Sequence, residues 1–145
     1  MRYLDNRGPR LRENDLDDFE KDANIILPAE YRSFLLRHNG GLPSPDVIDV
    51  KGAPGSPTDV QVFFGIGRPV ESSDLQWNRR TFVERLPSKW LPIARDSGGN
   101  LFCLSVSGPD AGSVMYVDLD QALPGFYFVA RSVDEFLDKL RTSAA

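Results

Sequence analysis

The sequence predicts a single α+β domain in which helices pack on one face of a mostly antiparallel β-sheet. The second half of the chain contains short apolar runs, separated by turns too short to hold the crossover helices that parallel strands require. The first half and the last residues instead show apolar side chains at helical spacing. With 145 residues, the chain is long enough to bury a core without support from a metal or a disulfide.

Four apolar runs predict the strands of the sheet, and they span residues 90–94, 101–106, 114–119 and 126–130. The segments between the first three runs, such as Ser97-Gly98-Gly99-Asn100, have turn compositions. We therefore expect an antiparallel meander. Ser132 and Glu135 then form a capping box for a last helix, whose inward positions are Val133, Phe136, Leu137 and Leu140.

Residues 1–12 are predicted to form an extended N-terminal arm, and residues 13–145 a single domain. The arm shows no sustained periodicity and carries four arginines, Arg2, Arg7, Arg10 and Arg12. Terminal segments of this composition are often loosely held. A helix is expected to follow, with Asn14 as its N-cap and carboxylates in its first turn. Its inward stripe is Leu16, Phe19 and Ala23.

The segment from Leu27 to Gly41 predicts a helix whose start and stop are both marked. Pro28 suits the first helical position, because its missing N–H is not needed there and its fixed φ matches the helix. The apolar face of this helix would contain Leu27, Tyr31, Phe34, Leu35 and His38. We expect Asn39, Gly40 and Gly41 to end the helix, because these residue types enter the left-handed conformation at little steric cost.

The middle of the chain is rich in glycine and proline and predicts a short strand near 47–50 followed by a long loop. Apolar and other residues then alternate over 60–66, which is typical of a half-buried strand. Ser73 and Gln76 have the spacing of a capping box for another helix, and Pro87 is expected to mark its end.

Composition and charge exclude several classes of function. Lysine and arginine total 17 and aspartate and glutamate 21, so the formal charge is −4, and an acidic domain repels a phosphate backbone. Nucleic acid is therefore not an expected partner. No apolar run approaches the roughly 20 residues that span a bilayer, and the start lacks the apolar segment of a signal peptide. Because Cys103 is the only cysteine, we expect a soluble protein of the reducing cytoplasm.

Catalytic chemistry has little support in the sequence. His38, the only histidine, is interpreted as a partly buried residue whose charged form favours the carboxyl end of a helix. Cys103 lies in an apolar run and is expected to behave as a small hydrophobic residue. The turn at 97–100 lacks the lysine and hydroxyl residue of a phosphate-binding loop. Three aspartates lack the spacing of a calcium loop, namely Asp110, Asp118 and Asp120. We predict no catalytic residue, no metal site and no cofactor.

The outer face of the first predicted helix is a candidate surface for binding a protein. Its carboxylates are Asp15, Asp17, Asp18, Glu20 and Asp22. Such a face is either simply solvated or complementary to a basic surface, for example the substrate groove of a nuclease.

A second candidate for partner binding is Tyr127 in the run Phe126-Tyr127-Phe128. Successive strand residues face opposite sides, so Tyr127 points away from the face that buries its two neighbours. If that side is open, Tyr127 is an aromatic anchor of the kind that interfaces use. If a helix or loop covers that side, Tyr127 belongs to the core.

Two blocks of sequence carry a family resemblance. The first is the proline-started helix that closes on Asn39-Gly40-Gly41, and the second runs from Trp90 to Ser105 and is followed by Gly112 to Asp118. In the order and spacing of these blocks, from about Asn14 to Leu140, the chain resembles the SUKH superfamily. That superfamily includes many bacterial toxin-immunity proteins and a fungal regulator of cell-wall assembly.

The resemblance implies an immunity protein that binds a co-encoded toxin and blocks its active site or an essential surface. It further implies mainly fold-making roles for the motif positions Pro28, Tyr31, Asn39, Gly40, Gly41, Ile93, Ala94, Asp96, Gly98 and Gly99. Asn100 departs from the family pattern, in which an acidic residue is more usual after the glycine. The arginine-bearing arm is not part of the pattern either.

Three functional hypotheses follow. The leading one is a cytoplasmic immunity protein that does no catalysis and neutralises a toxin, such as a nuclease, encoded by an adjacent gene. The second is a scaffold or regulatory module that recruits cellular proteins. The third is an enzyme acting on a small molecule through Cys103 or His38, neither of which has a local catalytic signature.

Overall fold

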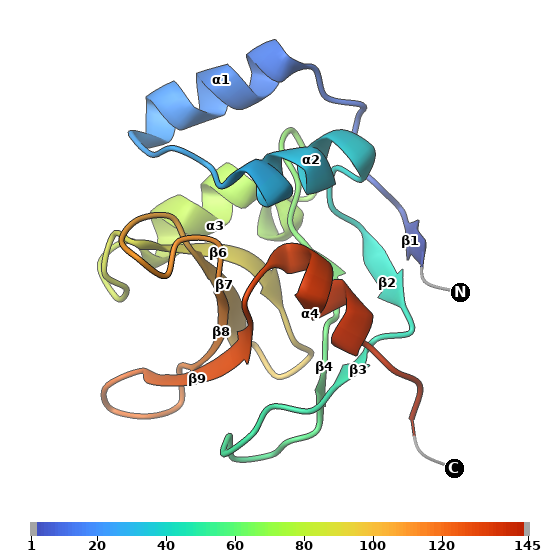
Figure 1. Cartoon of the computed structure of the whole chain (residues 1–145), viewed down its shortest axis with the longest axis vertical. Helices are drawn as coiled ribbons and strands as arrows, with labels where there is room; N and C mark the ends of the chain where they lie inside the picture. The colour runs from blue at the N-terminus through green and yellow to red at the C-terminus, as the bar shows by residue number, and fades with distance from the viewer. Residues whose placement is uncertain (1–2, 144–145) are drawn as a thin grey trace.

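The computed structural model of the chain describes residues 3–143 and contains a five-stranded antiparallel sheet (Figure 1). The strands run in the order β5 (Val62–Phe63), β6 (Trp90–Arg95), β7 (Leu101–Ser105), β8 (Val114–Asp118) and β9 (Gly125–Ala130). Each strand from β6 to β9 pairs antiparallel with the next one along the chain. The predicted meander and the predicted α+β class are therefore confirmed.

Two small sheets flank this meander. β1 (Tyr3–Asp5) pairs antiparallel with β2 (Leu42–Ser44), and β3 (Val47–Ile48) pairs antiparallel with β4 (Thr58–Asp59). The continuous strand predicted over 60–66 is wrong, because only β5 forms within it and Phe63 and Phe64 are both buried. The chain leaves the sheet at Gly65, whose N–H and carbonyl bond to the segment around α3 instead.

The helices are α1 (Glu13–Ala23), α2 (Ala29–Arg37), α3 (Leu75–Phe82) and α4 (Val133–Lys139), with a 3-10 turn at Glu71–Ser73. In Figure 1, α1 and α2 run side by side at one end of the molecule, and α4 lies over the sheet. The inward positions predicted for α1 and α2 are confirmed, because Leu16, Phe19, Tyr31, Phe34 and Leu35 are all buried.

Two helix starts differ from the sequence prediction by a short distance. The N-cap of α1 is Arg12 and not Asn14, because the Asp15 carboxylate accepts the Arg12 N–H at 2.8 Å. The N-cap of α3 is Asp74 and not Ser73, because the Asp74 carboxylate accepts the Trp77 N–H at 3.0 Å. In both cases an aspartate side chain provides the acceptor that fixes the first turn. The α3 helix also ends at Phe82, well before Pro87.

The predicted cap of α4 is confirmed. The Ser132 hydroxyl accepts the Glu135 N–H at 3.1 Å. This cap sets the direction in which α4 crosses the sheet, and it places Phe136 on the buried side of the helix.

A series of aromatic rings joins the helices to the sheet. Phe63 lies between Phe34 of α2 and Phe136 of α4, with ring centroids 5.3 and 5.4 Å away. Phe136 in turn contacts Phe102 of β7 at 5.0 Å. All of these rings are fully buried, so this contact series is the centre of the core.

The N-terminal segment described by the structure, residues 3–12, packs on the body of the molecule. Leu4 and Leu11 are buried. The Gly8 N–H donates to the Asn39 carbonyl at 2.9 Å, and Asn39 Nδ2 donates to the Pro9 carbonyl at 2.9 Å. The division of the chain at residue 12 stays a prediction, and Arg2 lies outside the described residues.

Candidate functional site

Asn39 is placed where three separate segments meet, and its side chain joins two of them to α2. Its Nδ2 donates to the carbonyls of Pro9 and Ile66, at 2.9 and 2.7 Å, and its Oδ1 accepts the Ile66 N–H at 2.7 Å. The expectation that Asn39 itself turns left-handed is wrong, since positive φ begins at Gly40. Asn39 therefore supports the fold through side-chain hydrogen bonds.

Gly40 and Gly41 bring the chain that follows α2 close to the backbone of β5. Their φ values are +75° and +133°, and a Cβ on Gly40 would lie 2.6 Å from the Phe63 carbonyl oxygen. Both features require glycine. Pro28 stands directly before α2, where its carbonyl accepts the Arg32 N–H at 3.0 Å, and Tyr31 is fully buried, which raises the pKa of its hydroxyl.

The buried Asp96 carboxylate, just after β6, accepts the hydrogen bonds that connect the second block of motif residues. Asp96 Oδ2 accepts hydrogen bonds from the hydroxyls of Tyr116, at 2.5 Å, and Thr58, at 2.8 Å. Its Oδ1 accepts the Asn100 N–H at 2.8 Å. The Asn100 side chain then donates to the Tyr116 hydroxyl at 3.0 Å and accepts the Leu119 N–H at 2.8 Å. An acidic residue at position 100 is unable to do both when ionised, so no charge contact is made there.

The other motif positions of this block are divided between core and turn. Ile93 and Ala94 are buried in β6. Gly98 and Gly99 lie in the exposed turn between β6 and β7, and the φ of Gly99 is +92°. The positions that the family resemblance marks thus contribute to packing, turns and buried hydrogen bonds.

The two residues considered for catalysis lie in unsuitable surroundings. Cys103 is fully buried in β7, and burial raises the pKa of its thiol. His38 is half-buried, and burial lowers its pKa, with further contributions from Arg7 and Arg37. The charged histidine expected at the end of α2 is therefore disfavoured, and Arg7 Nη1 lies 3.5 Å from the Arg37 carbonyl there. Within residues 3–143, no group of three or more His, Cys, Asp or Glu side chains is arranged to hold a metal ion.

The acidic face of α1 is partly neutralised by one arginine from α2. Arg32 pairs with Glu13 at 2.7 Å, Asp17 at 3.2 Å and Glu20 at 2.7 Å, and the hydrogen bond with Glu13 is the largest cause of its raised pKa. Asp15 is used to cap the helix. The sequence pattern of α1 alone did not reveal this pairing.

Asp18 and Asp22 are the carboxylates of the predicted acidic face that stay exposed and outside the Arg32 cluster. Burial, followed by the charge of Arg80, lowers the pKa of the Arg79 guanidinium on α3, and the charge of Asp22 opposes this shift. The end of α1 thus faces α3.

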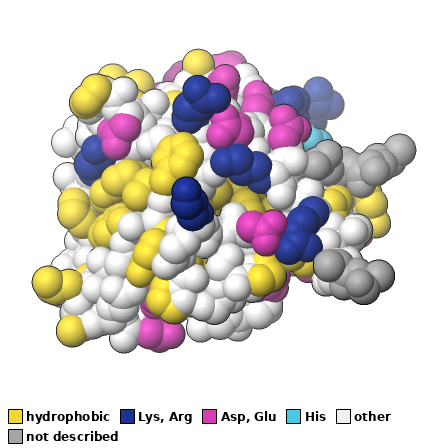
Figure 2. Space-filling view, turned by 60° about the horizontal axis from the view of Figure 1, so that its bottom comes forward, with side chains coloured by type: hydrophobic (Ala, Val, Ile, Leu, Met, Phe, Trp, Pro, Cys, Tyr) yellow, Lys and Arg dark blue, Asp and Glu magenta, His cyan; other side chains and the backbone are white. Residues whose placement is uncertain are grey.

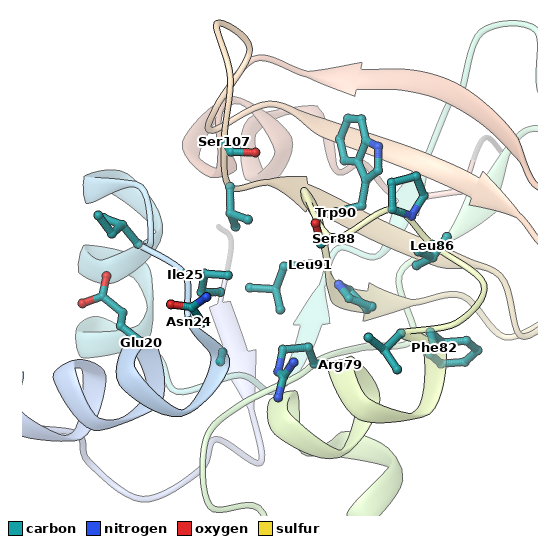
Figure 3. A pocket seen from close by; sticks show the side chains of 16 residues that line it. Glu20, Asn24, Ile25, Arg79, Phe82, Leu86, Ser88, Trp90, Leu91 and Ser107 are labelled. Atoms are coloured by element: carbon teal, nitrogen blue, oxygen red, sulfur yellow. The ribbon is translucent and has the colours of Figure 1, made fainter.

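An apolar groove of about 570 Å³ lies between these two helices and the start of β6. Figure 3 shows Leu91 projecting into the middle of the groove, between Ile25 on the α1 side and Arg79 and Phe82 on the α3 side. The remaining apolar lining comes from Ala23, Ile26, Val83, Leu86, Pro87, Trp90, Pro92 and Val106. We name this surface the α1–α3 groove.

The rims of the α1–α3 groove expose aliphatic side chains. Ile26 is 80% exposed on one side, and Val83 is 53% exposed on the other. Sequence reasoning missed both residues. For Ile26 the available signal was its place in the run Ile25-Ile26-Leu27, because three consecutive side chains in a short link between helices do not all point to one side, and Ile25 and Leu27 both pack against the core.

Tyr127 is half-buried and points to the helix-covered side of the sheet. It pairs with Tyr116, which pairs with Phe102, so these three share a face. Gln121 Nε2 donates to the Tyr127 hydroxyl at 2.8 Å, and Gly52 of the long loop approaches the ring. The ring that reaches solvent is Phe128 on the opposite face, with 51% of its surface exposed.

Hydrophobic side chains also gather on the face shown in Figure 2, mainly in the left half of the view, and many of the charged side chains lie above them. The register places Phe126, Phe128 and Met115 on the sheet face opposite α4. Trp90 contacts Phe126 with ring centroids 5.6 Å apart. Because Trp90 also lines the α1–α3 groove, the apolar surface continues from the groove to Phe126.

The fold and the contacts above define a small α+β domain whose polar clusters at Asn39 and Asp96 hold separate segments together. The model of the SMI1 / KNR4 family (SUKH-1) matches residues 10–139, and the chain belongs to that family. It is also similar to the SPbeta prophage-derived uncharacterized protein YokK of Bacillus subtilis (strain 168), with 28% identity over 151 residues. That similarity covers 92% of this chain and 77% of YokK. None of the helices within residues 3–143 is long and apolar enough to cross a membrane.

Proposed function

We propose that this protein is a cytoplasmic immunity protein that binds a co-encoded toxin and neutralises it by covering its active site or an essential surface. The protein does no catalysis of its own in this proposal. The observation that carries it is the α1–α3 groove, an apolar depression whose lining residue Arg79 interacts with the exposed Asp22 of α1. Membership of the SMI1 / KNR4 family supports the same function.

The apolar part of this surface provides the affinity in our proposal. Ile26 and Val83 hold hydrophobic surface in water on both rims of the groove. Covering it with a partner releases about 25 cal/mol per Å² of apolar area. Leu86, Leu91 and Trp90 line the depression between them, which suits an anchoring side chain of the partner.

The acidic part provides orientation and speed of encounter. Asp22 is exposed in the last turn of α1 and interacts with Arg79 of the groove lining, Asp18 is exposed in the middle of the helix, and Glu20 is bound to Arg32. Free carboxylates next to an apolar centre attract a partner with a basic surface, such as the substrate groove of a nuclease. We therefore place Asp18 and Asp22 at the interface, with Asp17 at its edge. Asp15 and Tyr127 also have structural contacts, since Asp15 accepts the Arg12 N–H and the Tyr127 hydroxyl accepts a hydrogen bond from Gln121.

Co-expression tests the proposed function. The product of the adjacent gene is produced in a sensitive host with and without this protein. We expect growth to be rescued only when both are present, and the two proteins to co-purify. No rescue together with no binding to the neighbouring product contradicts the proposal, and capture of varied cellular proteins instead indicates a scaffold role.

Substitutions on the groove rims test where the toxin binds. Ile26→Asp and Val83→Asp place a charge where the proposal requires apolar contact, and each is expected to weaken toxin binding at least about tenfold by calorimetry. Leu123→Asp is the matched control, since Leu123 is 83% exposed and does not line the groove. Equal binding by all three variants shows that the toxin binds elsewhere.

A further inference from the structure

Positively charged side chains gather where the N-terminal segment crosses the end of α2. A second groove there, of about 620 Å³, is lined by Arg7, Arg10, Arg37 and His38. In Figure 2 the single histidine, in cyan, lies beside Lys or Arg side chains at the upper right. We name this surface the arginine groove. It lies away from the α1–α3 groove and shares no lining residue with it.

The cations of the arginine groove have few carboxylate partners, although the chain has more acidic than basic residues. Arg7 Nη1 lies 3.1 Å from His38 Nδ1 and 3.5 Å from the Arg37 carbonyl, so its described partners are uncharged atoms. Arg37 pairs with Asp134 at 3.3 Å, and both side chains are about half exposed. Within residues 3–143 no ion pair reaches Arg10.

Arg68 lies under the same segment, although it does not line the arginine groove. Arg68 donates to the carbonyls of Asn6, at 2.5 Å, and Asn39, at 3.5 Å, but its buried Nε has no hydrogen-bond partner among the described residues. Arg68 also forms no ion pair there. Within residues 3–143 Arg7 and Arg10 of the groove have no ion pair, and the one carboxylate that pairs with Arg37 is half exposed. Cations gathered in this way repel one another, and a bound anion relieves that repulsion.

The segment that carries Arg7 and Arg10 is fixed in place. Gly8 lies so close to Asn39 that a Cβ on it would be 2.7 Å from Asn39 Nδ2. The Gly8 N–H and the Pro9 carbonyl both bond to Asn39, and β1 pairs with β2 just before. The backbone that carries Arg7 and Arg10 is therefore in place before any ligand arrives, which lowers the entropic cost of binding.

We propose that the arginine groove is a binding site for an oxyanion of the phosphate type, carried by a small ligand. Planar guanidinium groups match the oxygen geometry of phosphate through paired N–H donors. Arg7 and Arg10 line the groove from the N-terminal segment and Arg37 lines it from the end of α2, so an anion in the groove would have cations from both elements beside it. The site is independent of the immunity function, and either proposal stands if the other fails.

This site is tested by titrating the protein with pyrophosphate and following the ring signals of His38 by NMR. These signals are assigned without ambiguity, because His38 is the only histidine in the chain. Arg7 and Arg37 are the charged groups that shift its pKa, and Tyr3 and Leu137 flank it in an adjoining cleft. Pyrophosphate bound near His38 is expected to move its ring signals and to raise its apparent pKa, with a Kd of about 1 mM or tighter.

The variants make the test specific. Arg7→Ala and Arg10→Ala should each weaken pyrophosphate binding at least about fivefold, and Arg7→Lys, which keeps the charge but loses the paired donors, should weaken it as well. Lys51→Ala removes an exposed positive charge far from the groove lining and should change nothing. Amide spectra verify that each variant is folded.

Three outcomes overturn the proposal. The first is no change in the His38 signals up to about 10 mM pyrophosphate. The second is unchanged affinity in folded Arg7→Ala and Arg10→Ala, which places the anion elsewhere. The third is equally tight binding of malonate, because the site would then respond to any dianion and not to the oxygen geometry of phosphate.

Discussion

Replacing Phe136 with alanine is expected to lower the free energy of unfolding by about 3–5 kcal/mol. The Phe136 ring is fully buried and contacts Phe63 and Phe102 at 5.4 and 5.0 Å. Its removal leaves a cavity between α4 and the sheet that neither neighbour is able to fill without losing its own contacts. Urea unfolding followed by tryptophan fluorescence measures the loss.

Phe128→Ala is the control for this prediction. Phe128 belongs to the strand just before α4 but is half exposed, and its described contact is the Lys139 ammonium 5.5 Å from the ring centroid. We expect its replacement to cost less than about 1 kcal/mol. Similar losses for the two variants contradict the assignment of the core to the Phe63–Phe136–Phe102 contacts.

Asn39→Ala is expected to cost on the order of 3 kcal/mol, because it leaves several buried polar groups without partners. The Ile66 N–H and the carbonyls of Ile66 and Pro9 all lose the hydrogen bonds that Asn39 makes now. These bonds link α2 to the N-terminal segment and to the turn after β5. Hydrogen exchange should therefore show faster opening of residues near 8 and 66 as well as a lower unfolding midpoint.

Asn14→Ala provides the comparison for this second variant. Asn14 is exposed on α1, and alanine is the better helix former, so stability should change by less than about 0.5 kcal/mol. If Asn39→Ala is as mild as Asn14→Ala, then the three side-chain hydrogen bonds of Asn39 do not hold these segments together.

The sequence was most informative where local patterns determine structure. The four meander strands were predicted within one or two residues, because their apolar runs are separated by compact turns such as Ser97–Asn100. The Ser132 cap was also predicted, since serine and Glu135 stand at capping-box spacing. The caps at Arg12 and Asp74 were missed, because several residues near each helix start have acceptors and only the folded chain selects one.

The surfaces depended on contacts between distant residues and were predicted less well. The acidic character of α1 was visible in the sequence, but its pairing with Arg32 depends on how α2 packs beside it. The α1–α3 groove joins segments near residues 25, 83 and 90 that no local pattern connects. The role of Asn39 was likewise hidden, because its partners are about 30 residues away in each direction.

We propose that this protein neutralises a toxin by occupying its surface and not by chemical turnover. The most direct measurement is a titration of the purified product of the adjacent gene with this protein, with toxin activity as the readout. Our account predicts that activity falls in proportion to the protein added, vanishes near equal molar amounts and returns when the complex is dissociated. Lasting inactivation by far less than an equal amount of protein would contradict it.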